Sequence, residues 1–234
     1  MPSGPDFVWT LFYPHQKRGS AATKDMGILP SFKGVLCHDH WAPYYRYTDC
    51  LHALCNAHHI RELERAIEDD KQQWAQQLLT LLLEVKESVE KNEGAILMDV
   101  VQAQYKSRYL EILALGEKEC PLPPLDPTKP KTRGRIKKSK SRNLLERLRD
   151  FQDDTLRFMM DSRVPFTNNL AENDLRMTKV HQKISGCFRS PEGALIFCRI
   201  RSYLSTCRKH GVNMTEALSL LFRDKMPDFV VDST

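Results

Sequence analysis

Residues 33–45 read KGVLCHDHWAPYY, a short apolar run that ends in an acid and then in loop residues. The run follows Gly34 and has the composition of a buried strand, so it predicts a strand with Asp39 at its carboxyl end. Ligands of open α/β sheets usually bind at that end of a strand. Asp39 is therefore a candidate ligand, although a turn or helix-capping acid is the simpler interpretation of this residue taken alone.

Residues 167–176 read TNNLAENDLR, which has the pattern of a helix start. Asn168 and Asn169 are good N-cap residues because their amide oxygens can accept the first free N–H groups of a helix. Glu172, Arg176 and Lys179 then follow at i, i+4 and i+7, so they share one stripe. A solvated Glu–Arg pair is the simple interpretation, whereas a metal-binding carboxylate beside phosphate-binding cations is the functional one.

Further elements are expected on both sides of these two motifs. Strand patterns cover residues 7–13 and 52–55, and a turn or short hairpin is expected at residues 181–190. Helical patterns, including three amphipathic stripes between Asp39 and Glu172, cover residues 20–26, 57–69, 74–89, 97–113, 144–159, 192–209 and 214–221. Core packing is the accepted explanation of the three stripes, and Cys198 and Cys207 are expected in the core. The proline-rich residues 121–127 break the second stripe from the third.

Several short motifs follow one another in a recognisable order along the chain. They are KRGS at 17–20, GILP at 27–30, HDHW at 38–41 with Tyr44, CNAHHIREL at 55–63 and NNLAE at 168–172. In combination they are specific, although each alone is weak. From about Phe7 to about Phe222 the chain resembles the DDE transposases of insertion-sequence family 66.

The resemblance implies an α/β fold of the ribonuclease-H-like kind, a mixed sheet with helices on both sides and a large helical insertion. Such a fold holds two aspartates and one glutamate around Mg²⁺ or Mn²⁺. It implies that Asp39 is the second aspartate and that Glu172 is the glutamate, both catalytic and both metal ligands. It also places His58 and Arg61 beside the active centre, in supporting roles.

The chemistry of the family explains these residue types. Cleavage and strand transfer need an activated water or 3′-hydroxyl, and a pair of divalent ions stabilises the attacking and leaving oxygens. Mg²⁺ prefers carboxylates, waters and substrate phosphate to a closed protein cage. A strand-end aspartate and a helix-borne glutamate fit that preference.

The family order makes residues 7–13 the third strand of the sheet, so the first two strands and their aspartate are expected before Met1. Asp6 lies at the wrong strand end to replace that aspartate. We therefore expect a truncated and inactive form of the transposase. Its segments are residues 1–69 with the second aspartate, a helical insertion with a basic linker at 70–162, and residues 163–234 with the glutamate helix.

Basic residues indicate contact with nucleic acid, and the family resemblance implies that this partner is the double-stranded DNA of the transposon ends. Residues 129–142 carry eight Lys or Arg side chains and no acid, a pattern typical of a phosphate-binding segment or of a solvated linker. The candidate DNA-binding residues are Lys137, Lys138, Lys140, Arg176, Lys179, Lys183 and Arg189. Self-association and accessory transposition proteins are further expected partners.

Composition narrows the class of protein. The 234 residues are 41% hydrophobic, enough for a real core, and the net charge of +5 is compatible with nucleic acid. No apolar run approaches the roughly 18 residues of a membrane span, and no signal-peptide pattern begins the chain, so a cytoplasmic protein with reduced cysteines is expected.

Two alternatives stay open. A structural zinc site could use the residues Cys37, His38, His40, Cys50, His52, Cys55, His58 and His59, although paired Cys-x-x-Cys knuckles are absent. The second alternative is a non-catalytic DNA-binding or regulatory protein, which the missing first aspartate favours.

Overall fold

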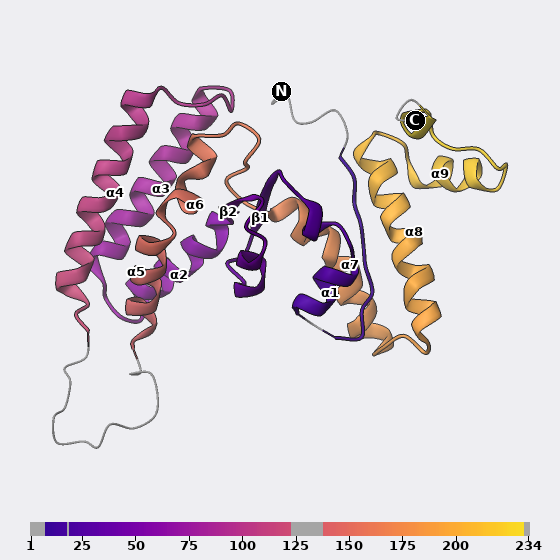
Figure 1. Cartoon of the computed structure of the whole chain (residues 1–234), viewed down its shortest axis with the longest axis horizontal. Helices are drawn as coiled ribbons and strands as arrows, with labels where there is room; N and C mark the ends of the chain where they lie inside the picture. Colours follow the sequence, from indigo (N-terminus) through magenta and orange to yellow (C-terminus); the bar gives the residue numbers. More distant parts are fainter. Residues whose placement is uncertain (1–7, 18, 123–137, 232–234) are drawn as a thin grey trace, which may run out of the picture. The chain divides into compact units, whose positions relative to one another are not determined.

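The computed structural model describes residues 8–17, 19–122 and 138–231, apart from the side chains of residues 177 and 181. It divides the chain into two compact units. Unit 1 is built from Lys33–Asn168, and unit 2 combines Ser3–Phe32 with Asn169–Thr234. Each unit is described by itself (Figure 1).

Unit 1 contains a small parallel sheet at the place where the sequence predicts strands. Strand β1 (Val35–His38) pairs with β2 (Leu51–Leu54), in a register that runs from Val35 opposite Leu51 to His38 opposite Leu54. The backbone N–H of Cys55 extends this ladder by donating to the carbonyl of His38 at 2.9 Å. The carboxyl ends of both strands therefore meet at the same edge of the sheet, where Asp39 and Cys55 follow.

Helices make up the rest of unit 1 and confirm most of the predicted spans. They are the 3₁₀ turn η2 (Ala42–Arg46), α2 (Asn56–Glu68), α3 (Gln73–Lys91), α4 (Asp99–Glu119), α5 (Lys140–Asp150), α6 (Gln152–Leu156) and η3 (Arg157–Met159). The single helix expected at residues 144–159 is wrong, because the chain breaks at Phe151. Its φ of −119° and ψ of 37° are not helical, and its ring packs against His40 and Tyr45 instead.

The core of unit 1 lies where α2, α3, α4 and α5 pack together, and Figure 1 shows α3 and α4 side by side. Trp74 is fully buried there, and the phenol of Tyr109 donates to the carbonyl of Leu148 at 2.9 Å. The backbone of α4 comes so close to Trp74 that only glycine fits at residue 116. A Cβ atom on Gly116 would lie 2.7 Å from Leu145 Cδ1 and 2.9 Å from Trp74 Cγ.

Unit 2 is also helical. It contains α1 (Ser20–Asp25), the 3₁₀ turn η1 (Leu29–Ser31), α7 (Asn169–Ser185), α8 (Pro191–Lys209), α9 (Met214–Leu221) and α10 (Asp228–Val231). The turn or hairpin expected at residues 181–190 is wrong in its first half, because α7 continues to Ser185. The predicted burial of Cys198 and Cys207 on α8 is confirmed.

The strand expected at residues 7–13 is not found among the described residues. Residues 8–13 are extended and alternate in burial, but they lie along a helix rather than in a sheet. The N–H of Thr10 donates to Thr206 Oγ1 at 3.0 Å, and the N–H of Phe12 donates to Ser202 Oγ at 2.8 Å. The alternation that predicts a strand is thus produced by packing against α8.

A partly buried ion pair attaches helix α7 to α8 and to the extended segment. Lys209 Nζ on α8 donates to Asp174 Oδ2 on α7 at 2.6 Å and to Thr10 Oγ1 at 2.7 Å. Both charged side chains are no more than 20% exposed. Asp174 therefore fixes α7, the helix that carries Glu172, to α8 and to the extended segment within unit 2.

The described residues thus form a mostly helical α/β structure with a two-stranded parallel sheet. This agrees with the predicted class, whereas the ribonuclease-H-like sheet stays a prediction.

Candidate active site

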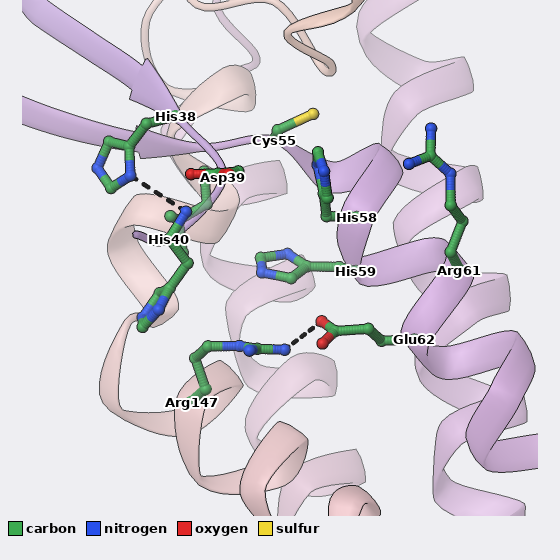
Figure 2. Close-up of a pocket in the computed structure, with 10 residues that line it drawn as sticks. His38, Asp39, His40, Cys55, His58, His59, Arg61, Glu62 and Arg147 are labelled. Atoms are coloured by element: carbon green, nitrogen blue, oxygen red, sulfur yellow. Dashed lines mark hydrogen bonds and ion pairs between the residues drawn. The ribbon is translucent and has the colours of Figure 1, made fainter. Parts of the chain in front are cut away.

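A polar cavity of about 170 Å³ opens at the carboxyl ends of β1 and β2 in unit 1 (Figure 2). Side chains from four places in the sequence border it: the ends of β1 and β2, the first turns of α2 and the second half of α5. The lining residues are His38, Asp39, His40, Leu54, Cys55, His58, His59, Arg61, Glu62 and Arg147. A cavity of this size has room for several water molecules.

Asp39 stands at the place that the sequence predicts, directly after the last residue of β1. Its Oδ1 accepts the N–H of Trp41 at 3.2 Å, which holds the carboxylate in a turn. Its Oδ2 has no hydrogen-bond partner among the described residues. The geometry therefore combines the turn-forming role of an aspartate with one carboxylate oxygen that is available to a ligand.

His38 and His52 have both of their ring nitrogens engaged in a chain of hydrogen bonds. The N–H of His40 donates to His38 Nδ1 at 3.1 Å, so the proton of His38 is on Nε2 and points to His52 Nδ1, also at 3.1 Å. His52 Nε2 in turn lies 3.0 Å from the carbonyl of Tyr47. Burial lowers the pKa of His38 to about 4, so the ring is neutral at pH 7.

His40, the residue after Asp39, has a left-handed backbone with φ of 65°. This conformation costs a non-glycine residue roughly 1 kcal/mol. The ring packs edge-on against Phe151, with ring centroids 4.4 Å apart, and this contact holds the strained turn. Burial lowers the pKa of the His40 ring as well, with a further contribution from Arg147.

His59 is almost completely buried, at 2% exposure, and its ring orientation is fixed by Asn56. The amide nitrogen of Asn56 donates to the carbonyl of Thr155 at 3.0 Å, so the amide oxygen faces His59 Nδ1 at 3.1 Å. Burial lowers the pKa of His59 to about 3, which keeps the ring neutral. Figure 2 shows this ring projecting from α2 toward the side of the cavity where Arg147 lies.

An ion pair between Glu62 on α2 and Arg147 on α5 lies below His59. The pair engages the carboxylate of Glu62, the second acidic side chain that lines the cavity. Asp39 is therefore the cavity carboxylate that remains without a cationic partner among the described residues.

The other two predicted site residues of unit 1 border the same cavity. Cys55 Sγ lies within 4.8 Å of a ring nitrogen of His58, so this pair could supply two ligands to a soft metal ion. Arg61 is exposed at the rim, with its guanidinium directed away from Glu62 (Figure 2). The hydrogen bonds of His38 and His52 leave neither ring free to join a zinc site.

The family that matches this sequence is the transposase IS66 family, over residues 3–195. The match covers most of the chain and includes the whole cavity. The chain belongs to the IS66 transposase family. No curated protein and no solved structure gave a match.

In this IS66-family chain the second group of predicted site residues belongs to unit 2. Glu172 lies in the first turn of α7, and Arg176, Lys179 and Lys183 follow it as exposed side chains on one stripe of the same helix. Arg189 is exposed in the connection to α8. Because Asp39 belongs to unit 1 and Glu172 to unit 2, their pairing stays a prediction.

The predicted DNA-binding lysines near α5 are placed only in part. Lys138 pairs with Glu146, at 2.6 Å and 2.5 Å to its two oxygens, and Lys140 is exposed at the start of α5. Lys137 and the preceding basic residues lie outside the described residues, as does Asp6. Arg142, the last cation of the basic segment, is buried between Glu117 and Glu146.

The sequence singled out neither Glu62 nor Arg147, and it indicated His59 only as a possible zinc ligand. Asn56 and His59 stand at i and i+3 on the predicted α2 helix, a spacing that indicates a local hydrogen bond. No signal links Glu62 to Arg147, because 85 residues separate them. Within the part of the chain that is described, no helix is long and apolar enough to cross a membrane.

Proposed function

We propose that this chain acts in DNA transposition as a DDE-type transposase of ribonuclease-H-like fold. In this proposal Asp39 and Glu172 are the metal ligands and the catalytic carboxylates. Family membership implies a DNA-cleaving and strand-transferring class of enzyme that binds DNA and uses a divalent metal ion. The observation that carries the residue assignment is the free carboxylate oxygen of Asp39, which borders a polar cavity at the carboxyl end of a parallel strand.

The donor chemistry of the cavity fits a hydrated Mg²⁺ or Mn²⁺ ion. Such an ion keeps several waters and is held by one or two carboxylates together with substrate phosphate. Asp39 supplies one such carboxylate in unit 1, and in this proposal Glu172 supplies the next from unit 2. The metal, when bound, stabilises the charge that develops on the oxygens of a phosphodiester under attack.

The remaining residues have supporting tasks. His58 and Arg61 border the cavity at its rim, where Arg61 can neutralise a DNA phosphate. Arg176, Lys179 and Lys183 form an exposed cationic stripe on α7, one turn and more beyond Glu172, and Arg189 extends the positive charge. With Lys137, Lys138 and Lys140 they would hold the DNA backbone, which positions the substrate without reading its sequence.

Metal titration tests the carboxylate assignment directly. We expect Mn²⁺ binding, measured by calorimetry, to weaken at least tenfold in Asp39→Asn and in Glu172→Gln. Asp49→Asn, which changes an acid outside the cavity, is the matched control and should bind as the parent chain does. Unchanged binding in both site variants would overturn the assignment.

A second candidate function is DNA binding without cleavage. The ion pair between Glu62 and Arg147 favours it, because the pair leaves one free carboxylate in the cavity of unit 1. A supercoiled plasmid with the transposon ends separates the two candidates. Nicking that requires Mn²⁺, Asp39 and Glu172 supports the enzyme, whereas DNA binding without nicking supports the second candidate.

A further inference from the structure

The ring of His59 has a defined hydrogen-bonding polarity. The carbonyl of Thr155 can only accept, so the amide group of Asn56 must present its nitrogen to that carbonyl and its oxygen to His59. Since the amide oxygen can only accept, the proton of the neutral ring is on Nδ1. Nε2 of His59 therefore carries a lone pair and is an acceptor.

This acceptor borders the cavity that Asp39 also borders. His59 is 2% exposed as a residue, but its Nε2 is not among the described buried polar atoms that lack a partner, so this atom stays open to the cavity. An acceptor that is open to a small cavity takes a hydrogen bond from a water molecule or ligand there. Asp39 borders the same cavity, which is large enough to hold water.

We propose that His59 is a positioning residue whose Nε2 accepts a hydrogen bond from a water molecule on the metal ion held by Asp39. This inference rests on the proposed function and adds a residue to it. The bound water donates one O–H to His59 and keeps its oxygen toward the metal. A carbonyl-to-amide-to-imidazole chain of this kind orients the groups around metal sites in general.

Because Nε2 of His59 is an acceptor, a DNA phosphate is excluded as its partner. A DNA phosphate offers only acceptor oxygens, and two facing acceptors repel. Direct coordination of Mg²⁺ is also disfavoured, since this ion prefers oxygen ligands. Water on the ion is a donor, and its donor strength is raised by the metal charge.

Nitrogen NMR on the parent chain tests the polarity without any substitution. Long-range proton–nitrogen spectra should show His59 protonated on Nδ1, and Mg²⁺ should shift the Nε2 resonance in the direction of a stronger accepted hydrogen bond. The His59→Gln spectrum assigns the signal. A proton on Nε2, or an Nε2 signal that Mg²⁺ leaves unchanged although Mg²⁺ binds, would overturn the proposal.

Metal affinity gives the second readout. Mn²⁺ binding should weaken about tenfold in His59→Leu and less in His59→Gln, whose amide oxygen can still accept. His210→Gln, which alters a histidine of unit 2, is the control. If Asp39→Asn weakens binding while His59→Leu does not, only this inference fails. If Asp39→Asn has no effect, the proposed function fails first.

Discussion

Glu62 and Arg147 neutralise each other on the wall of the cavity that Asp39 borders. The pair joins α2 to α5 and sits next to His59, so it controls both the charge and the width of that side of the cavity. Of the two acidic side chains that line the cavity, Glu62 is therefore not free to bind a metal ion.

Removal of the cation should release that carboxylate. We expect Arg147→Met to tighten Mn²⁺ binding about tenfold, which corresponds to ~1.4 kcal/mol, because Glu62 then faces the cavity without its partner. Calorimetry measures the change. Arg65→Met removes a cation of α2 that pairs with Asp70 outside the cavity, and it should leave the affinity unchanged. Equal or weaker binding by Arg147→Met would show that Glu62 cannot reach the ion.

The buried neutral histidines should make unit 1 sensitive to acid. Folding lowers the pKa of His38 to about 4 and that of His59 to about 3, both below the ordinary value of 6.5. The unfolded chain therefore binds these two protons first, and the free energy of unfolding falls as pH drops from about 6.5 toward 4. Each histidine contributes up to ~1.4 kcal/mol per pH unit.

Urea unfolding followed by tryptophan fluorescence between pH 4.5 and 7.5 measures this dependence. His59→Gln should flatten it by one proton, since glutamine does not titrate. His15→Gln is the control, because the pKa of His15 is raised by its hydrogen bonds to Lys17 and Asp25 and its effect has the opposite sign. A slope that is identical in His59→Gln and the parent chain would contradict the neutral buried ring.

Close packing at Gly116 predicts an unusual response to alanine. Alanine usually stabilises a helix by up to ~1 kcal/mol relative to glycine. In Gly116→Ala the new methyl group meets Leu145 and the indole of Trp74, so we expect destabilisation by about 1–3 kcal/mol in urea unfolding. Gly193→Ala on α8 is the matched substitution, with only Ser190 Oγ at 3.4 Å, and should not destabilise.

The cationic stripe of α7 predicts a salt-dependent contact with DNA. Each of the substitutions Arg176→Ala, Lys179→Ala and Lys183→Ala should lower the slope of log affinity against log salt by roughly 0.9. Fluorescence anisotropy with a labelled duplex measures the slope. Lys91→Ala on α3 removes another exposed cation, which pairs with Glu87, and it should leave the slope unchanged. Equal losses in all four variants would indicate non-specific attraction by net charge.

The sequence predicts elements best where one local pattern is sufficient. The stripe from Trp74 to Val89 predicts α3, and the apolar run before Asp39 predicts β1. The prediction fails where distant contacts override local preference. Residues 8–13 have strand periodicity, but two of their N–H groups, those of Thr10 and Phe12, donate to hydroxyls of α8 instead of to a neighbouring strand. Phe151 interrupts a helical pattern because its ring packs against His40, more than 100 residues earlier in the chain.

In the candidate site, too, the sequence predicts what depends on local neighbours and misses what depends on distant contacts. The place of Asp39 at the end of β1 follows from its own neighbours in sequence. The acceptor role of His59 depends on the carbonyl of Thr155, 99 residues from Asn56, and a single sequence contains no trace of that bond. Whether Asp39 and Glu172 share a metal ion stays a prediction of the family resemblance.

The N–H groups of Thr10 and Phe12 donate to the hydroxyls of Thr206 and Ser202. These two bonds are possible because the spacing of alternate amides in an extended chain is close to the spacing of every fourth side chain on a helix. Alternate amides of an extended chain are ~6.6 Å apart, and side chains four residues apart on a helix are ~6 Å apart along its axis. Four helical residues therefore span nearly the same distance as two residues of an extended chain, and a pair of hydroxyls can take the place of a neighbouring strand. The match holds over two bonds and drifts beyond them, so α8 can fix the register of a short extended segment but cannot serve as the edge of a long one.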